Sequence, residues 1–151
     1  MAIGWAVVAA VCVVNIVIAV RSTGDLDGST PGELEQRYGE LRPLLAGSRT
    51  AAYVTDNRWR FLNARYALAP TVFDHRFVEL EDDGRTIAAF DVDGMVVRAR
   101  DEPPLAVLCD FDRATELGAF LEDLSAAARP RGVDLRVLHH RGGVALVRLG
   151  A

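Results

Sequence analysis

The sequence predicts an α/β fold, with α+β as the alternative, in which a small mixed sheet follows a transmembrane helix and is covered by about three helices. The main signal is Ala51–Val72, which reads as a short strand, an acidic turn, a helix of about three turns and a terminating proline. A second signal is Leu105–Cys109, a continuous apolar run typical of a strand buried on both faces. The third is Ala2–Val20, which is apolar apart from Asn15.

The length of this N-terminal run predicts a membrane anchor. At 1.5 Å per residue, a helix over Ala2–Val20 would span roughly 28 Å, close to the hydrocarbon core of a bilayer. We therefore expect residues 1–21 to form the anchor, residues 22–30 a polar linker and residues 31–151 an α/β domain. The alternatives are a buried core helix and a cleaved signal peptide ending near Val17–Ala19, although no basic residue precedes the run.

The charges that flank the anchor bear on its orientation. Arg21 follows the apolar run, and the positive-inside rule counts arginine while barely counting Asp25 and Asp27, so the flank favours a cytoplasmic domain. The resemblance described below favours the extracytoplasmic side. We expect the extracytoplasmic orientation.

Composition argues against several classes of function. The chain has 151 residues, which suits one domain, and its net charge of −4 offers no basic surface to a nucleic acid. It contains no lysine, so neither a Schiff-base lysine nor a P-loop lysine is available. Its two cysteines, Cys12 and Cys109, lie in the apolar run and in an expected strand, so we expect no disulfide.

The first helix of the domain is expected after the linker. Thr30–Glu33 has the spacing of a capping box, with Pro31 at the first helical position. Apolar residues then recur at helical spacing as far as Gly47, which can end the helix. Because the polar side has mixed charges, we expect this helix to cover the sheet and not to lie on a membrane. The apolar positions are Leu34, Tyr38, Leu41 and Leu45.

The central stretch is expected to form a β-α-β unit. Ala51–Thr55 and Thr71–Phe73 read as strands, and Arg58–Ala69 reads as the helix between them. Strands that are joined by a helix in this way are usually parallel, so we expect a parallel pair.

Arg65 is the unusual residue of the central helix. Helical spacing places it between two apolar groups, one of which contains Tyr66, and leaves Asn63 on the exposed side. A buried charge without a partner is very costly, so we expect Arg65 to pair with an acid. The nearest acids in the sequence are Asp56 and Asp74.

A hairpin is expected after the central unit. Thr86–Phe90 and Met95–Arg100 are strand-like runs, and Asp91–Gly94 between them supplies the Asp and Gly of a turn. The preceding segment, His75–Asp83, is expected to extend the second strand or to form a loop.

The C-terminal third is expected to form a helix and a second hairpin. Asp112 is a natural N-cap for a helix over Arg113–Ala128. Val133–His139 and Val144–Leu149 are expected to pair as a hairpin, with the last strand held within the sheet.

Acidic side chains follow three expected strands. Asp56, Asp74 and Asp110 would each lie just past a strand end, where α/β sheets bind ligands, and could hold Mg²⁺ or act as an acid–base pair. The alternative is that they form turns and caps.

Arginines near the same turn suggest an anion site. Arg58, Arg60 and Arg65 could hold a phosphate or carboxylate beside the start of the helix, or could be solvated and structurally paired. We take Asp56, Arg58, Arg65 and Asp74 as the candidate ligand or anion site.

Neither the histidines nor the second cysteine indicates a catalytic site. His139 and His140 are neighbours on an expected strand and point to opposite faces, so they cannot chelate one metal together. Cys109 is expected to be buried and not nucleophilic. The sequence has no GxSxG, GxGxxG, P-loop, HExxH or CxxC motif. We therefore expect no catalytic residue, no metal and no cofactor.

One segment resembles a group of small uncharacterised bacterial proteins. The residues are Tyr53–Asp56, then Arg60–Leu62, then Ala64–Pro70. Those proteins have an N-terminal apolar anchor and a compact α/β domain, and similar segments occur near or attached to membrane glycosyltransferases that build cell-envelope polymers. The resemblance implies an accessory domain that faces the envelope, and it supplies no catalytic residue.

The sequence thus predicts a single-pass, membrane-anchored interaction domain. Its expected partners are the lipid bilayer, through Ala2–Val20, and a membrane protein such as an envelope glycosyltransferase. The alternative is a small enzyme or anion-binding module that acts on a phosphorylated or sugar substrate through the strand-end acids and Arg65.

Overall fold

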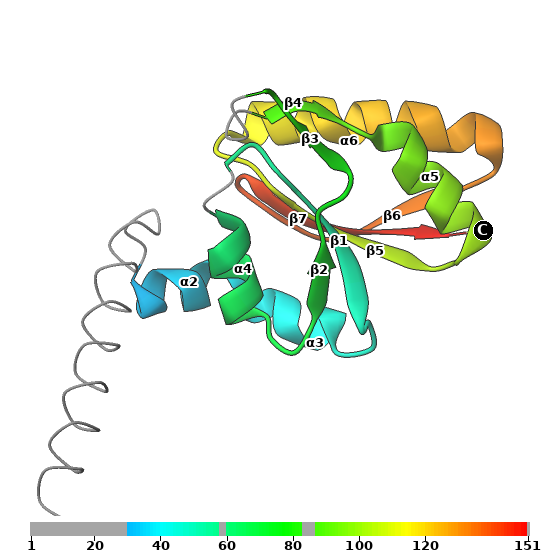
Figure 1. The fold of residues 1–151 in the computed structure, drawn as a ribbon. Helices are drawn as coiled ribbons and strands as arrows, with labels where there is room; N and C mark the ends of the chain where they lie inside the picture. Colours follow the sequence, from blue (N-terminus) through cyan, green and yellow to red (C-terminus); the bar gives the residue numbers. More distant parts are fainter. Residues whose placement is uncertain (1–29, 58–59, 83–86, 151) are drawn as a thin grey trace, which may run out of the picture.

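A five-stranded mixed sheet lies between two layers of helices in the computed structural model (Figure 1), which describes residues 30–57, 60–82 and 87–150. The strand order is β2-β1-β5-β7-β6, where β1 pairs in parallel with β2 and β5, and β7 pairs antiparallel with β5 and β6. These strands are β1 (Thr50–Thr55), β2 (Val72–Asp74), β5 (Leu105–Asp110), β6 (Asp134–Arg141) and β7 (Val144–Gly150). The expected mixed α/β sheet, with its parallel β-α-β unit, is confirmed.

The helices divide between the two faces of the sheet (Figure 1). One face is covered by α2 (Pro31–Tyr38), the 3₁₀ helix η1 (Gly39–Leu41), α3 (Arg42–Leu45) and α4 (Arg60–Ala67). The other is covered by α5 (Val92–Asp101) and α6 (Ala114–Ala128), which continues into the 3₁₀ helix η2 (Arg129–Arg131). A separate hairpin of β3 (Val78–Leu80) and β4 (Ile87–Phe90) lies beside α6.

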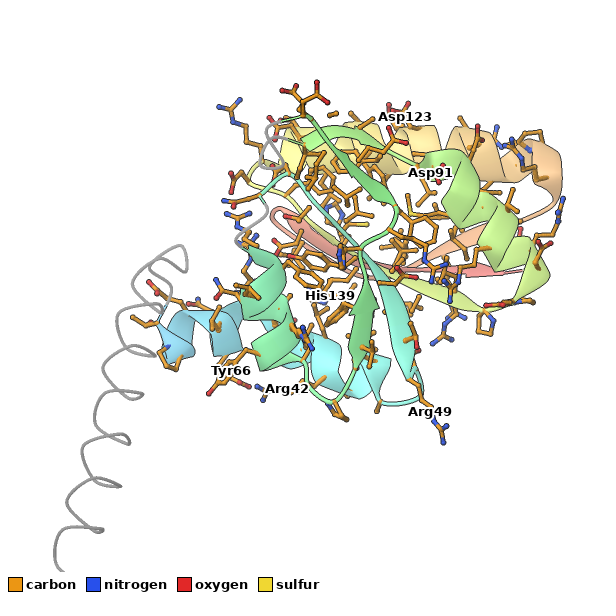
Figure 2. The ribbon with its side chains drawn as sticks, in the orientation of Figure 1. Arg42, Arg49, Tyr66, Asp91, Asp123 and His139 are labelled. Atoms are coloured by element: carbon orange, nitrogen blue, oxygen red, sulfur yellow. The ribbon has the colours of Figure 1, made fainter. Side chains whose placement is uncertain are left out.

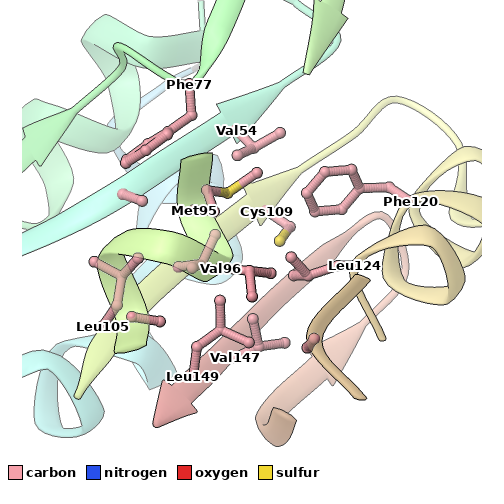
Figure 3. Close-up of a cluster of buried hydrophobic side chains, with 14 of the residues drawn as sticks. Val54, Phe77, Met95, Val96, Leu105, Cys109, Phe120, Leu124, Val147 and Leu149 are labelled. Atoms are coloured by element: carbon pink, nitrogen blue, oxygen red, sulfur yellow. The ribbon is translucent and has the colours of Figure 1, made fainter. Parts of the chain in front are cut away.

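The sheet has a hydrophobic core on each face because residues alternate along its central strands. Val54, Val107 and Cys109 contribute to the core beneath α5 and α6, which Figure 3 shows around Met95. The intervening residues, such as Leu108, contribute to the core beneath α2, α3 and α4. Every residue of β5 is buried, so the expectation of a strand covered on both faces is confirmed.

The start of the first helix is as expected, but the helix is interrupted. The Glu33 backbone N–H donates to Thr30 Oγ1 at 3.3 Å, and the Thr30 N–H donates to the Glu33 carboxylate at 2.6 Å, so both bonds of the capping box are present. The α-helix ends at Tyr38 and resumes as α3 only after the 3₁₀ segment. Pro43 lies in the first turn of α3, where its missing N–H costs no hydrogen bond.

The prediction of a hairpin with its turn at Asp91–Gly94 is wrong. Residues Val92–Asp101 form α5, and Asp91 is its N-cap, whose side chain accepts a hydrogen bond from the Gly94 N–H at 2.8 Å. A side chain at position 94 would collide with the Asp91 carboxylate, so the glycine makes room for the cap. Met95, Val96 and Ala99 are buried against the sheet, and this burial outweighs the preference of valine for strands.

The segments on either side of α5 also differ from expectation. His75–Asp83 contains a separate strand, β3, which pairs antiparallel with β4 and does not extend β2. Asp112 does not cap α6, because that helix begins at Ala114 and its N-cap, Arg113, makes no side-chain capping bond. The C-terminal hairpin is confirmed, and β7 lies between β5 and β6 as expected.

The anchor prediction lies outside the described residues. Within residues 30–57, 60–82 and 87–150, no helix has the length and apolar character needed to cross a bilayer. Ala2–Val20 precedes this part of the chain.

We predict that Asp91→Ala destabilises the domain by about 1 kcal/mol, because it removes the capping bond to the Gly94 N–H. Asp93→Ala is the matched control, since Asp93 is an exposed acid of the same helix whose ion pair with Arg131 lies at the surface. Its expected effect is below about 0.5 kcal/mol. Urea unfolding followed by circular dichroism measures both changes, and equal effects would argue against the cap.

Candidate functional site

The candidate site lies where β1 and β5 end side by side, which we call the carboxyl edge. Thr55 of β1 is paired with Asp110 of β5, so Asp56 lies beyond the same edge. The chain runs from β1 to β2 on one side and later returns to β5 on the other. This reversal is the position at which open α/β sheets bind their ligands.

The centre of the carboxyl edge is the fully buried carboxylate of Asp110. Its Oδ1 accepts hydrogen bonds from the guanidinium of Arg37, through Nε at 3.1 Å and also through Nη2. Its Oδ2 accepts from the hydroxyl of Tyr38 and, at 3.0 Å, from that of Tyr53. Arg60 Nη1 lies 3.6 Å from Oδ1. Asp110 is thus surrounded by donors of the protein itself, as a buried carboxylate requires.

The environment of Asp110 keeps both tyrosine hydroxyls protonated. Burial raises the pKa of Tyr38 and of Tyr53 above the ordinary value of 10.0, and the negative charge of Asp110 raises both further. A neutral phenol can donate to the carboxylate, whereas a phenolate would repel it. Burial likewise raises the pKa of the Cys109 thiol, so this cysteine is held in its unreactive form.

A second group of polar residues lies at the rim of the carboxyl edge. The Asp112 backbone N–H donates to Asp56 Oδ2 at 2.7 Å, and Arg60 forms an ion pair with the Asp112 carboxylate. Burial raises the pKa of Asp56, and the nearby carboxylates of Asp112 and Glu116 act in the same direction. The Asp112 N–H and the charge of Arg60 oppose this rise. The pKa of Asp56 is therefore raised overall, because burial outweighs these favourable contacts.

Asp74 does not reach the carboxyl edge, contrary to expectation. It pairs opposite Ala52, which places it roughly 13 Å short of Asp56 along the strand direction. Its carboxylate contacts Arg76 at 2.7 Å and Arg98 at 2.8 Å. Partial burial acts to raise the pKa of Asp74, but hydrogen bonds from Arg76 and both positive charges lower it overall.

Arg65 is exposed, so the prediction that it is buried and paired is wrong. The helix is rotated relative to the expected arrangement, because Asn63 and the small residues Ala64 and Ala67 face the interior. Small side chains let α4 lie close to its neighbours, whereas Tyr66, which was expected inside, is 77% exposed. Within the described part of the chain, no contact joins Arg65 to Asp56 or Asp74.

The structure therefore brings together a different set of residues from the predicted one. Of the four candidates, Asp56 lies at the carboxyl edge, Arg65 and Asp74 do not, and Arg58 is outside the described residues. The sequence reading missed Arg37 and Tyr38, which lie in α2 and more than 70 residues from Asp110 in the chain. A tyrosine on the apolar side of a helix needs a hydrogen-bond partner for its hydroxyl, and this was the available signal.

Two hollows flank the carboxyl edge. One has a volume of about 320 Å³ and is mainly apolar, with Phe61 and Leu62 of α4 facing Leu80 and Ile87 of the hairpin. The other is a groove of about 600 Å³ between β4 and α6. Its lining combines the aromatic residues Phe90, Phe111 and Phe120 with the acids Asp56, Glu116 and Asp123.

The histidines are placed as the strand pattern predicts. His139 pairs opposite Leu146 and His140 opposite Ala145, and these two partners belong to the cores on opposite faces of the sheet. His139 Nδ1 lies 3.7 Å from a carboxylate oxygen of Glu40. Among the described residues, no group of three or more His, Cys, Asp or Glu side chains is arranged to hold a metal ion.

Comparison with known proteins gives no relative from which a role could be transferred. No protein-family model, curated protein or solved structure matches the chain.

We predict that Arg37→Leu destabilises the domain by about 3 kcal/mol, because it leaves the buried Asp110 carboxylate without its main counter-ion. Arg65→Leu is the same substitution at an exposed arginine, and its expected effect is within about 0.5 kcal/mol. Chemical unfolding of the two variants measures the difference. A large loss of stability for Arg65→Leu, or none for Arg37→Leu, would contradict the structure.

We predict that Asp56→Asn stabilises the domain at neutral pH. Because the folded pKa of Asp56 is raised, ionising it costs more in the folded state than in the unfolded chain, and the amide removes this cost. The gain in unfolding free energy is complete above the folded pKa of Asp56, and it disappears below the pKa of 3.8 that Asp56 has in the unfolded chain.

Asp74→Asn is the control of opposite sign. The folded pKa of Asp74 is lowered, so its charge contributes stability above the unfolded value of 3.8, and this contribution is lost as the pH falls through the folded pKa. The substitution should therefore destabilise at neutral pH and have no charge effect in acid. Unfolding free energies measured across the acid range check both signs.

Proposed function

We propose that the chain is a single-pass, membrane-anchored accessory domain, on the extracytoplasmic side, which binds a membrane-protein partner such as an envelope glycosyltransferase. The observation that carries this proposal is the state of the carboxyl edge. At the position where an α/β enzyme would hold its substrate, the Asp110 carboxylate is fully buried and bonded to Arg37, Tyr38 and Tyr53. These side chains hold the domain together and leave no group of that network free for a reaction.

The N-terminal sequence supports attachment to a membrane. Ala2–Val20 has the length and apolar character of a spanning helix, and the polar linker 22–30 connects it to α2. The resemblance to anchored envelope proteins supports the same location.

The apolar hollow supports a role in binding a partner. Its volume of about 320 Å³ suits one or two apolar side chains, and Leu62 and Leu80 at its rim are 44% and 45% exposed. A partner that fills such a hollow with an apolar anchor gains affinity by removing these side chains from water.

A second candidate is a small enzyme that acts on a sugar or phosphorylated substrate. The observation that favours it is Asp56, whose raised pKa and position beside Glu116 at the groove resemble those of a general acid. Asp56→Asn separates the two proposals, because it would abolish an acid-catalysed reaction and leave partner binding through the apolar hollow unchanged.

Purification of the tagged full-length chain from native membranes in mild detergent tests the proposal. We expect a membrane protein to co-purify, and Leu80→Arg to abolish its recovery by placing a charge at the rim of the hollow. Val137→Arg is the matched control, because Val137 has nearly the same exposure, 47%, on the edge strand β6. A chain that purifies alone from these membranes would refute the proposal.

A further inference from the structure

One side of the domain gathers basic and exposed apolar side chains, and we call it the Tyr66 face. It consists of Arg42 of α3, Arg49 just before β1 and Val72 of β2, which line one groove, and of the consecutive exposed residues Arg65 and Tyr66 of the adjoining α4. Figure 2 shows Arg42, Arg49 and Tyr66 along the lower side of the molecule, away from Asp91 and Asp123. Two of its helices, α3 and α4, are connected by a hydrogen bond of 2.9 Å from Arg42 Nε to the carbonyl of Ala67, at the end of α4.

The charge of the Tyr66 face is positive. Arg42 is neutralised by Glu35 at 2.8 Å, but in the described part of the chain Arg49 and Arg65 have no acidic partner. A shallow groove of about 670 Å³ between α3 and the start of β2 is lined by Arg42 and Arg49, and none of its described lining residues is acidic. The chain as a whole has a net charge of −4, so this concentration of unneutralised arginine runs against the overall balance.

Exposed apolar side chains lie among these arginines. Tyr66 is 77% exposed and Val72 is 63% exposed, and they are the two most exposed large hydrophobic residues of the described chain. A tyrosine with its ring outside and its hydroxyl free to bond with headgroups is typical of a membrane interface. Arginine binds lipid phosphates with two parallel hydrogen bonds.

With the proposed anchor, the linker limits how far the domain can lie from the bilayer. Residues 22–30 can span at most roughly 30 Å, and α2, which begins directly after them, packs against α4. Because the domain is held at this distance, binding of the face to lipid is an intramolecular step with a high effective concentration.

We propose that the Tyr66 face docks on the surface of an anionic bilayer, with Tyr66 and Val72 at the interface and Arg49 and Arg65 on lipid phosphates. The inference rests on the proposed membrane anchor. It fixes the orientation of the domain, since the groove that contains Asp123 then faces away from the lipid (Figure 2).

Photo-crosslinking of the full-length chain tests this orientation. Benzoylphenylalanine in place of Tyr66 should form lipid adducts when the chain is reconstituted in phosphatidylcholine vesicles that contain phosphatidylglycerol, and fewer adducts in phosphatidylcholine alone. The same group in place of Asp123, on the exposed side of α6, is the control and should form none. Arg49→Glu combined with Arg65→Glu should reduce the adducts at position 66 by at least about tenfold, since each arginine near an anionic surface contributes roughly a factor of five.

The possible outcomes separate the two proposals. A chain that resists alkaline carbonate extraction but gives no lipid adduct at position 66 keeps the anchor and overturns the docking inference. Adducts at this position with a second copy of the chain, or with another protein in native membranes, also overturn it. A chain that carbonate removes from the vesicles refutes the anchor, and the docking inference fails with it. Unchanged circular dichroism of the double variant shows that loss of adducts does not result from unfolding.

Discussion

The buried carboxylate of Asp110 is the constraint on which the rest of the structure depends. A buried carboxylate is tolerated only when donors surround it, and here they come from Arg37 and Tyr38 of α2 and Tyr53 of β1. Arg60 of α4 adds a positive charge, with its Nη1 3.6 Å from Asp110 Oδ1. One charge therefore fixes two helices against the ends of the two central strands. Removing a donor is costly, so this requirement determines how α2 and α4 are placed on the sheet.

The same constraint shapes the functional interpretation. Because Arg37, Tyr38 and Tyr53 all bind Asp110, the two surfaces that we consider for recognition lie to either side of this network. The apolar hollow beside Leu62 and Leu80 and the Tyr66 face differ in chemistry, and our proposals give the first to a protein partner and the second to lipid. A tethered domain that uses both would hold its partner at a fixed height above the bilayer.

Sequence signals succeeded where the cause was local. Thr30 and Glu33 form their capping box, and the apolar run at Leu105–Cys109 is a strand covered on both faces. They failed where distant contacts decided the outcome. Asp91 looked like part of a turn but caps a helix whose burial against the sheet no local pattern reveals. Arg65 was expected inside because it lies between two apolar groups, but the side of α4 that packs is its small-residue side. The arginine that binds Asp110 is Arg37, which lies 73 residues away in the chain.

Alkaline titration of the tyrosines tests the central claim most directly. In a Tyr66→Phe variant only Tyr38 and Tyr53 remain of the three tyrosines, and both donate to Asp110. Since burial and the Asp110 charge raise both pKa values, we predict no phenolate absorbance near the ordinary pKa of 10.0 while circular dichroism stays native. The absorbance should rise only as the domain unfolds. A phenolate signal that titrates near the ordinary value in the folded protein would show that the carboxyl edge is open to water, and would contradict the account.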